Sequence, residues 1–485
     1  MKSTPFASLF ALLMLLISIP RLDAQNVKYP AGIEEKIRQV ETNLSGWVSF
    51  EGEKPWTIAD RMKQLSINGL SIAVINDNQI EWSKTYGWAD VAEKRPVTEK
   101  TLFQAASISK SFNGVGVLKL AQEGRIDLNT DINQYLTSWK FPYNEQYGTK
   151  QITLAALLSH TAGLTVHGFP GYEIGDTIPT LPQILDGVTP ANTMAVRSMS
   201  EPGKNYVYSG GGVTISQLAV MDVTRLPYDV FMQKKVLDPM GMKSSFFMQP
   251  PPKSKKKMLA TGYGGDGKEI PGKYYIYPEQ AAAGLWTNPA DLCKYIIETQ
   301  LSWKGMSGKV LTPEMTKLRL TPVLQESAYG VFVSRKKSSV YFSHSGGNKG
   351  FRSYYVGDLE EGVGVAIMVN SDNGTILEEI ANSVAAVYEW KDYNKPVIKK
   401  VVKVSDTLLD KYVGKYKFGE ETVTIKKEGR DLFINAFGDL FWKAYFTSDT
   451  DFFVMEYKAD MKFQISSEGR VTGFFLGGMA IRKVE

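Results

Sequence analysis

The chain has 485 residues, of which 43% are hydrophobic and 22% are charged, and its formal net charge is +5. This length allows roughly two or three domains, and the composition is that of a folded protein rather than a disordered one. A charge of +5 spread over such a length gives no concentrated basic surface, so the sequence predicts no nucleic-acid partner.

The N-terminus has the pattern of a segment that directs export. Lys2 precedes an apolar run, residues 9–19, and the small residue Ala24 follows shortly after it. The run is too short to cross a bilayer, so the sequence predicts a cleaved signal peptide over residues 1–24, with an uncleaved membrane anchor as the alternative. No later segment is apolar over about 18 residues. We therefore expect a secreted protein, periplasmic or extracellular in a bacterium, without a stable membrane span after signal removal.

Strand and helix patterns then predict one mixed α+β domain over residues 26–395. Residues 70–90 alternate around the turn Asn76-Asp77-Asn78 as two strands, and four further strands follow Tyr329. The expected fold is an antiparallel sheet built from both ends of the domain and flanked by helices. The helical patterns cover residues 107–123, 154–160, 213–223, 228–236, 289–300 and 377–390.

A second, smaller domain is predicted after this one. The charged, proline-containing tract at residues 396–404 is typical of a linker. Six short alternating segments follow between residues 421 and 478, separated by glycine-rich or charged turns. Short strands of this kind, without helical patterns between them, are typical of a small all-β barrel or sandwich, and we expect the barrel over residues 405–485.

The pattern S-x-x-K occurs three times, at Ser107/Lys110, Ser254/Lys257 and Ser334/Lys337. Only the first opens a predicted helix, where the i,i+3 spacing puts both side chains on one face. A helix N-terminus supplies N–H groups that stabilise an oxyanion, and a shielded lysine can take the proton of a serine hydroxyl. Taken alone, the motif fits a nucleophile beside its base and an N-cap serine beside a solvent-reaching lysine equally well.

Two further segments of the domain carry residues of related chemistry. Tyr208 stands on a glycine-rich turn, EPGKNYVYSGGG, and a phenol near an ammonium group can act as a general base. By itself such a tyrosine is more often a packed aromatic residue. The strand end His344-Ser345-Gly346-Gly347 has the glycines that let a substrate lie along its edge, although alone it also fits a hairpin turn.

In this order, the three elements resemble the penicillin-recognising serine hydrolases. Within them the chain looks most like the class C β-lactamase group, which includes D-alanyl-D-alanine carboxypeptidases, D-aminopeptidases and esterases, over about residues 45–390. The segments LLSHTAGL, PMGMKSS and AAAGLWTNPADLCKYI are also similar to family segments. The resemblance implies a β-lactamase-like fold, an antiparallel sheet flanked by helices plus a helical subdomain. The C-terminal part resembles the lipocalin-like β domain often appended to such hydrolases.

By this resemblance Ser107 is the acylated nucleophile, Lys110 its proton partner, and Tyr208 the general base for attack and deacylation. The strand residues 344–346 line the substrate-binding site, and the amides of Ser107 and Gly347 form the oxyanion hole. The implied reaction is acyl transfer through a covalent acyl-enzyme, with no metal and no cofactor. The expected partner is a small-molecule or peptide substrate, and the sequence leaves the oligomeric state open.

Two positions depart from the family pattern. Gly210 stands where family members usually have asparagine, so a side-chain amide that holds the acyl group of the substrate is missing. His344 replaces the lysine of the third motif, and a neutral imidazole holds a carboxylate less firmly than an ammonium does. Lys349 and Arg352 are the candidates for compensating in substrate binding. His160, within LLSHTAGL, is interpreted as a helix-end cap rather than as a catalytic base.

The sequence therefore predicts an exported serine hydrolase of the peptidase or esterase type, which cleaves an amide or ester bond by acylating Ser107. One alternative is a β-lactamase or a D-alanyl-D-alanine carboxypeptidase. Another is a non-catalytic peptide-binding or sensor protein that has kept the fold, and Gly210 is the residue that favours it.

Overall fold

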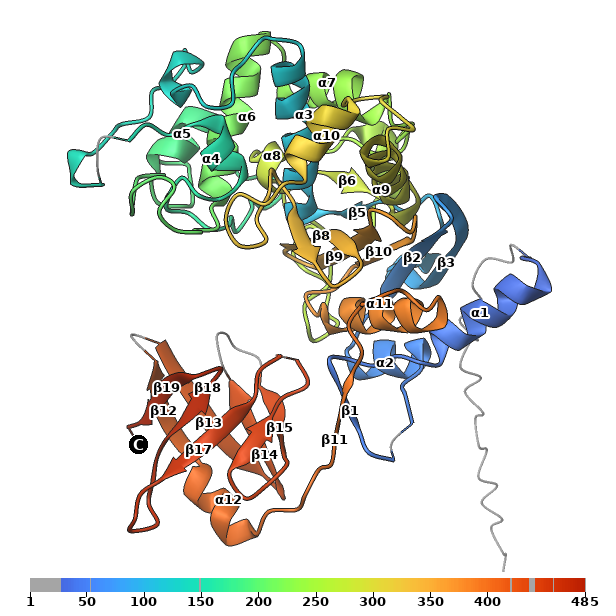
Figure 1. Ribbon diagram of the computed structural model, residues 1–485, viewed down its shortest axis with the longest axis vertical. Coiled ribbons are helices and arrows are strands. Elements are labelled where there is room, and N and C mark those ends of the chain that lie inside the picture. Colours follow the sequence, from blue (N-terminus) through green and yellow to red (C-terminus); the bar gives the residue numbers. More distant parts are fainter. Residues whose placement is uncertain are drawn as a thin grey trace, which may run out of the picture.

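The structure, a computed structural model, describes residues 28–52, 54–147, 150–418, 421–435, 441–456 and 458–484. A large α/β unit and a smaller β-barrel follow one another along the chain (Figure 1). The predicted signal peptide, residues 1–24, lies outside the described residues. Within the described part of the chain, no helix is long and apolar enough to cross a membrane.

The larger unit is organised around a seven-stranded antiparallel sheet with the strand order β4-β3-β2-β10-β9-β8-β7. Early and late strands meet at its centre, where β2 pairs with β10 and Val74 lies opposite Val365. The prediction that both ends of the domain build the sheet is confirmed. The strands are β2 Gly69–Asn76, β3 Gln79–Asp90, β4 Arg95–Pro96, β7 Phe332–Arg335, β8 Val340–Asn348, β9 Phe351–Asp358 and β10 Gly364–Val369.

The helices predicted from the sequence are present, with ends that differ by a few residues. A two-stranded pair, β5 Phe103–Gln104 with β6 Trp286–Thr287, lies among them. The helices are α1 Ala31–Glu41, α2 Ile58–Gln64, α3 Ser109–Gln122, α4 Leu154–Leu158, α5 Leu181–Asp186, α6 Gly210–Thr224, α7 Tyr228–Met232, α8 Gln280–Ala283, α9 Pro289–Trp303, α10 Pro313–Arg319 and α11 Thr375–Val387.

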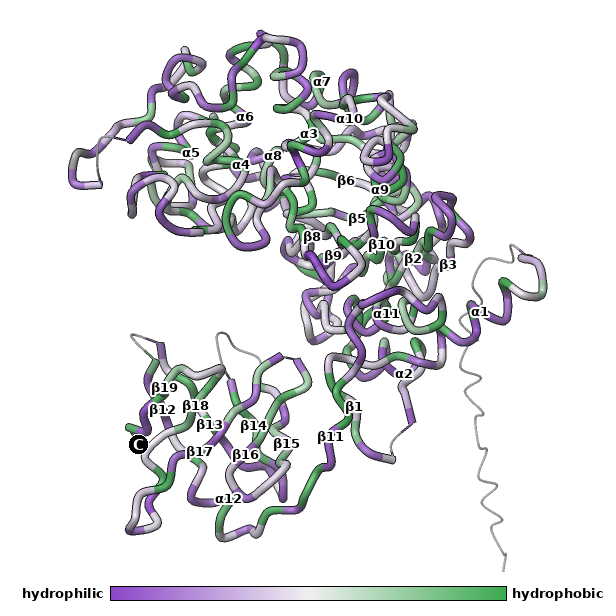
Figure 2. Tube along the Cα trace, viewed as in Figure 1, coloured by the Kyte–Doolittle hydropathy of each residue, from purple (hydrophilic) through white to green (hydrophobic). Residues whose placement is uncertain are grey.

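Helices cover both faces of the sheet. The side chains of the central strands point alternately into two hydrophobic cores, one on each face. Val365 and Ile367 of β10 join a core that includes Ile380 of α11. Ala366 and Met368 join the other core, to which α3 and α9 contribute. A strand buried on both faces forms a continuous apolar run, and Figure 2 shows such hydrophobic stretches along the central strands.

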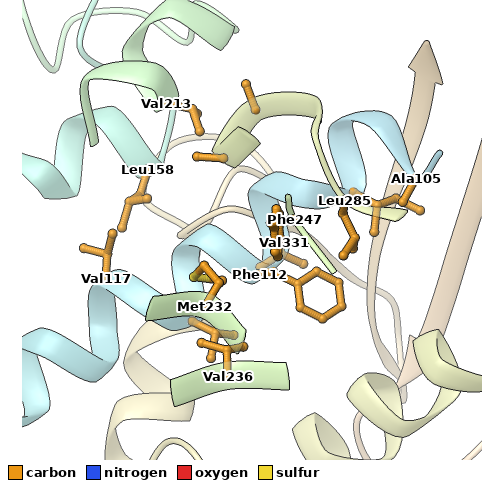
Figure 3. Close-up of a cluster of buried hydrophobic side chains, with 14 of the residues drawn as sticks. Ala105, Phe112, Val117, Leu158, Val213, Met232, Val236, Phe247, Leu285 and Val331 are labelled. Atoms are coloured by element: carbon orange, nitrogen blue, oxygen red, sulfur yellow. The ribbon is translucent and has the colours of Figure 1, made fainter. Parts of the chain in front are cut away.

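Helix α3 runs through the interior of the helical region and is buried along most of its length. Figure 3 shows Phe112 and Val117 of this helix among side chains of other elements, including Leu158 and Met232. A helix without an exposed face is expected to lie inside a protein in this way. The helix begins later than the predicted start at Ser107, because residues 106–108 form a 3-10 turn before it.

The C-terminal body is a closed β-barrel, which confirms the predicted barrel. One helix, α12 Asp406–Tyr412, precedes the strands where the sequence pattern indicated none, and the Ser405 side chain caps it. Tyr412 stacks on Phe463 with ring centroids 3.7 Å apart, so packed aromatic side chains fill the interior. The strands are β12 Gly414–Phe418, β13 Glu421–Glu428, β14 Asp431–Asn435, β15 Trp442–Phe446, β16 Asp451–Phe453, β17 Met461–Ile465, β18 Val471–Leu476 and β19 Met479–Lys483.

The segment predicted as a linker makes ordered contacts. Its strand β11, Val397–Lys399, pairs in parallel with β1, Val48–Phe50, near the start of the larger unit. Beside this pair, Trp47 packs edge-on against Phe453 of the barrel, with ring centroids 5.8 Å apart. The Lys399 ammonium lies 4.7 Å from the centroid of the same Phe453 ring. The barrel is therefore held against the first residues of the larger unit.

Candidate active site

Ser107 and Lys110 lie together, as their spacing predicts. The Lys110 Nζ atom is 2.9 Å from Ser107 Oγ and 2.8 Å from the carbonyl oxygen of Ala282 in α8. The lysine is buried, whereas Ser107 is partly exposed to solvent. The arrangement therefore joins an accessible hydroxyl to a shielded amine, which suits proton transfer between them.

The turn that carries Ser107 is fixed from both sides. Ala106 has a left-handed backbone, with φ +49°, which turns the chain into α3. The Ser109 hydroxyl donates to the Ala106 carbonyl oxygen at 2.6 Å and accepts the Leu285 N–H at 3.0 Å. Ser109, the second serine of this segment, therefore holds the turn in place.

Tyr208 lies beside this pair. It precedes α6, whose N-terminus is capped by the Ser209 hydroxyl accepting the Gly212 N–H at 2.9 Å. The Lys110 Nζ atom is 5.1 Å from the centroid of the Tyr208 ring. Segments about 100 residues apart in the sequence thus meet around one ammonium group.

His160 also belongs to this group, although sequence reasoning assigned it only to a helix end. It does follow the end of α4, but its ring faces the Tyr208 ring with centroids 4.3 Å apart. Its Nδ1 atom accepts the Ser209 N–H at 3.2 Å. The family-like segment LLSHTAGL contained the residue, but no local pattern indicates which distant side chain it contacts.

The strand β8 lies against the turn of Ser107. A Cβ atom on Gly346 would be 2.1 Å from the Ala105 carbonyl oxygen, so only glycine permits this approach. On the neighbouring strand, the Ser353 hydroxyl donates to the same carbonyl oxygen at 2.9 Å. The third predicted segment is therefore adjacent to the first.

The outer edge of β8 can accept an extended segment. Within the described residues, β7 pairs with β8 only as far as Ser343. A two-residue turn joins β8 to β9, so the closing pair, Asn348 and Phe351, exchanges hydrogen bonds and every second residue does the same. Ser345 and Gly347 then direct their N–H groups away from β9. This places the Gly347 amide on the open edge of the strand.

His344 is a buried, neutral imidazole. Burial, together with the nearby Lys110 charge, lowers its pKa to about 3. Its Nδ1 atom lies 2.6 Å from the Ser345 carbonyl oxygen, which can only accept, so Nδ1 carries the proton. The remaining nitrogen, Nε2, is buried and has no hydrogen-bond partner among the described residues. His344 thus carries no positive charge at this position, where the lysine of the family pattern would carry one.

Lys349 and Arg352, the candidates for compensating, are both paired with Asp372. The Lys349 ammonium is 3.5 Å and the Arg352 guanidinium 3.0 Å from this carboxylate. Arg352 Nη1 also donates to the carbonyl oxygens of Asn348 and Phe351. Both cations therefore lie at the β8–β9 turn, where they contact Asp372.

The place of the missing asparagine side chain is filled by an aromatic ring. A Cβ atom on Gly210 would lie 2.9 Å from Phe169 Cε2 and 3.1 Å from the His167 carbonyl oxygen. That carbonyl accepts the Gly210 N–H at 3.2 Å, so the loop that carries Phe169 is bonded to the start of α6. The absence of a side chain at Gly210 therefore leaves room for the loop that carries His167 and Phe169.

The mutation Gly210→Asn is expected to lower stability, because the Phe169 ring must move to admit the new side chain. Overpacking of this kind costs about 1–3 kcal/mol. In a Phe169→Ala background the same substitution should cost less. Urea unfolding of the two single variants and the double variant measures this coupling. An equal cost of Gly210→Asn in both backgrounds would show that Phe169 is not the obstacle.

With this geometry established, comparisons with known proteins assign the family. Residues 57–388 match the family model described as Beta-lactamase, and the chain belongs to this family. It is 25% identical to Protein flp of Staphylococcus aureus (strain N315) over 331 residues, 68% of this chain and 64% of flp. It is 20% identical to Penicillin-binding protein 4* of Bacillus subtilis (strain 168) over 426 residues, 83% of this chain and 91% of that protein.

Solved structures show the same fold. An octameric penicillin-binding protein homologue from Pyrococcus abyssi superposes with a TM-score of 0.61 at 19% identity, covering 86% of this chain and 94% of that one. The crystal structure of SurE with D-Leu gives a TM-score of 0.56 at 17% identity, covering 88% and 97%. The resemblance to the serine β-lactamase and penicillin-binding protein superfamily, and the β-lactamase-like fold, are confirmed. This superfamily is one of serine hydrolases.

Proposed function

We propose that the chain is an exported serine hydrolase of the peptidase or esterase type, which cleaves an amide or ester bond through a covalent acyl-enzyme on Ser107. The observation that carries the proposal is the 2.9 Å separation of Ser107 Oγ and Lys110 Nζ, next to Tyr208. An accessible hydroxyl beside a buried amine and a phenol contains the groups that acyl transfer needs. The N-terminal sequence pattern supports export.

In the proposed reaction, Ser107 Oγ attacks the carbonyl carbon of the substrate, and its proton is relayed through Lys110 to Tyr208. The bond to the leaving nitrogen or oxygen breaks, the leaving group takes up this proton, and the acyl group stays on Ser107. A water molecule, deprotonated by Tyr208, then attacks the ester carbonyl and releases the acid, and Ser107 regains a proton. The amides of Ser107 and Gly347 stabilise the negative carbonyl oxygen in both steps.

The electrostatics of the site favour a substrate without a carboxylate next to the scissile bond. His344 is neutral and so offers no positive charge at the position of the family lysine, and Lys349 and Arg352 share the Asp372 carboxylate at the β8–β9 turn. A penicillin or a D-alanyl-D-alanine peptide carries such a carboxylate, which a positive side chain would hold. Neutral esters and amides are therefore the preferred substrates in this proposal.

The test is covalent labelling of the full chain by a fluorophosphonate, followed by mass spectrometry of the digested protein. We expect one adduct, on the peptide that contains Ser107, and none in Ser107→Ala. A panel of nitrocefin, p-nitrophenyl esters and D-amino-acid amides then separates the substrate classes. Esters and amides are expected to turn over faster than nitrocefin.

Other results would lead to other conclusions. Efficient nitrocefin hydrolysis, or release of D-alanine from a cell-wall peptide, would identify a β-lactamase or a carboxypeptidase. A folded protein with no adduct and no turnover would refute the proposal. Saturable peptide binding by such an inert protein would indicate a binding or sensor role.

A further inference from the structure

We propose that His160 is the positioning residue for Tyr208, which it holds over Lys110 through a side-chain acceptor. This inference rests on the proposed function, because Tyr208 is the general base there. His160 is buried, and it lies on the segment after α4, far from Tyr208 in the sequence. The proposed reaction itself does not involve this histidine.

His160 binds the chain on both sides of Tyr208. Its carbonyl oxygen accepts the Val207 N–H at 2.8 Å, and its Nδ1 atom accepts the Ser209 N–H at 3.2 Å. Tyr208 is the residue between these two bonds, and the two rings face one another at 4.3 Å with planes 35° apart. A single residue therefore fixes the main chain before and after the phenol and packs against the phenol ring.

The segment that carries His160 is itself anchored. The Thr161 carbonyl oxygen accepts the Gly203 N–H at 2.6 Å, which extends the contact to the start of the Tyr208 loop. The Ser159 carbonyl oxygen accepts the Ser327 hydroxyl at 2.7 Å. His160 has a left-handed backbone with φ +58°, a conformation that glycine and asparagine adopt at lower cost than most residues. The segment that carries His160 is thus held in place by hydrogen bonds to other parts of the structure.

The hydrogen bond to Ser209 requires one protonation state. A backbone amide can only donate, so Nδ1 must have its lone pair free and the proton must be on Nε2. Burial keeps the pKa of His160 well below its ordinary value, and the Lys110 charge acts in the same direction. The aromatic groups that face it are Tyr206 and Tyr208. His160 therefore stays neutral and keeps its acceptor.

Two substitutions at position 160 are compatible with its left-handed backbone. Together they separate the effect of the Nδ1 acceptor from that of the rest of the histidine side chain. His160→Gly removes the side chain without backbone strain, and His160→Asn keeps an acceptor oxygen close to the position of Nδ1. In the full chain acting on a neutral p-nitrophenyl ester, His160→Gly should lower kcat by about 10- to 100-fold with KM changed less than about 3-fold. His160→Asn should recover most of this loss.

The substitutions His160→Gly and His160→Asn are then each introduced into a Tyr208→Phe background. If His160 acts through Tyr208, His160→Gly should cost less than about 3-fold in kcat there, because the group that it positions is already gone. Thermal unfolding of every variant shows that the comparison is made between folded proteins.

Each contrary result has its own meaning. An equal loss in both backgrounds, or no recovery in His160→Asn, would overturn the positioning role, as would a kcat that His160→Gly leaves unchanged. Absence of Ser107 labelling and of turnover in the wild-type chain would instead refute the proposed function, and this inference with it.

Discussion

Replacing Lys110 with methionine is expected to lower the rate of Ser107 acylation by about 10³-fold, within the range that a positioned proton acceptor supplies. Methionine has a similar length and keeps the buried packing, but it removes the amine that lies 2.9 Å from the Ser107 hydroxyl. The hydrogen bond to the Ala282 carbonyl oxygen is lost as well, at 2.8 Å in the wild type. The rate of fluorophosphonate labelling, followed by intact mass, measures the effect directly.

The chain provides a matched control for this experiment. Lys257 ends another S-x-x-K pattern but is exposed in the short 3-10 helix Lys253–Met258. Lys257→Met should leave the labelling rate unchanged. If Lys110→Met were labelled as fast as the wild type while remaining folded, Lys110 would not be the proton partner of Ser107.

Replacing Glu279 with glutamine is expected to remove a loss of stability that the wild type shows as pH rises from about 4.5 to about 8. Glu279 lies at the start of α8, fully buried, and its carboxyl oxygens have no hydrogen-bond partner among the described residues. Burial raises its pKa from 4.5 to about 8. Between these two values the folded state keeps a proton that the unfolded state has released. The free energy of unfolding of the wild type therefore falls as pH rises through this window, by up to about 1.4 kcal/mol per pH unit.

Urea unfolding at pH 5 and pH 8 tests this prediction. The difference in unfolding free energy between Glu279→Gln and the wild type isolates Glu279, because all other ionisable groups are the same in both proteins. We expect the variant to gain stability relative to the wild type from pH 5 to pH 8. A difference that does not change with pH would show that the Glu279 carboxyl ionises normally, with access to water.

Local patterns were sufficient for part of the candidate site. The spacing of Ser107 and Lys110 predicts their contact because three residues cover nearly one helical turn. Alternating residues likewise predict β8 and β9, and their short turn sets the register that brings Gly346 to the Ser107 turn. These features depend on interactions between residues close in the sequence.

Other features depend on packing between distant segments, which one sequence does not reveal. The ring of Phe169 fills the space next to Gly210, and the ring of His160 faces Tyr208. Phe169 lies on an irregular segment without a periodic pattern, and His160 lies where the chain leaves α4, so its direction is not set by the helix. The ion pairs of Lys349 and Arg352 were missed for the same reason, since Asp372 follows a different strand. The sequence therefore indicates which residues could take part in the site, but not which distant residues they contact.

The contact between β9 and the turn before Ser107 has a consequence for the order of folding. The Ala105 carbonyl oxygen, next to the Ser107 turn, accepts a bond from a hydroxyl 248 residues later in the chain. Contacts of this span form slowly, because a long loop must close before they contribute. A growing chain would contain Ser107 and Lys110 long before the strand that completes their surroundings. The candidate active site can therefore be assembled only after the chain has emerged as far as β9 and β10.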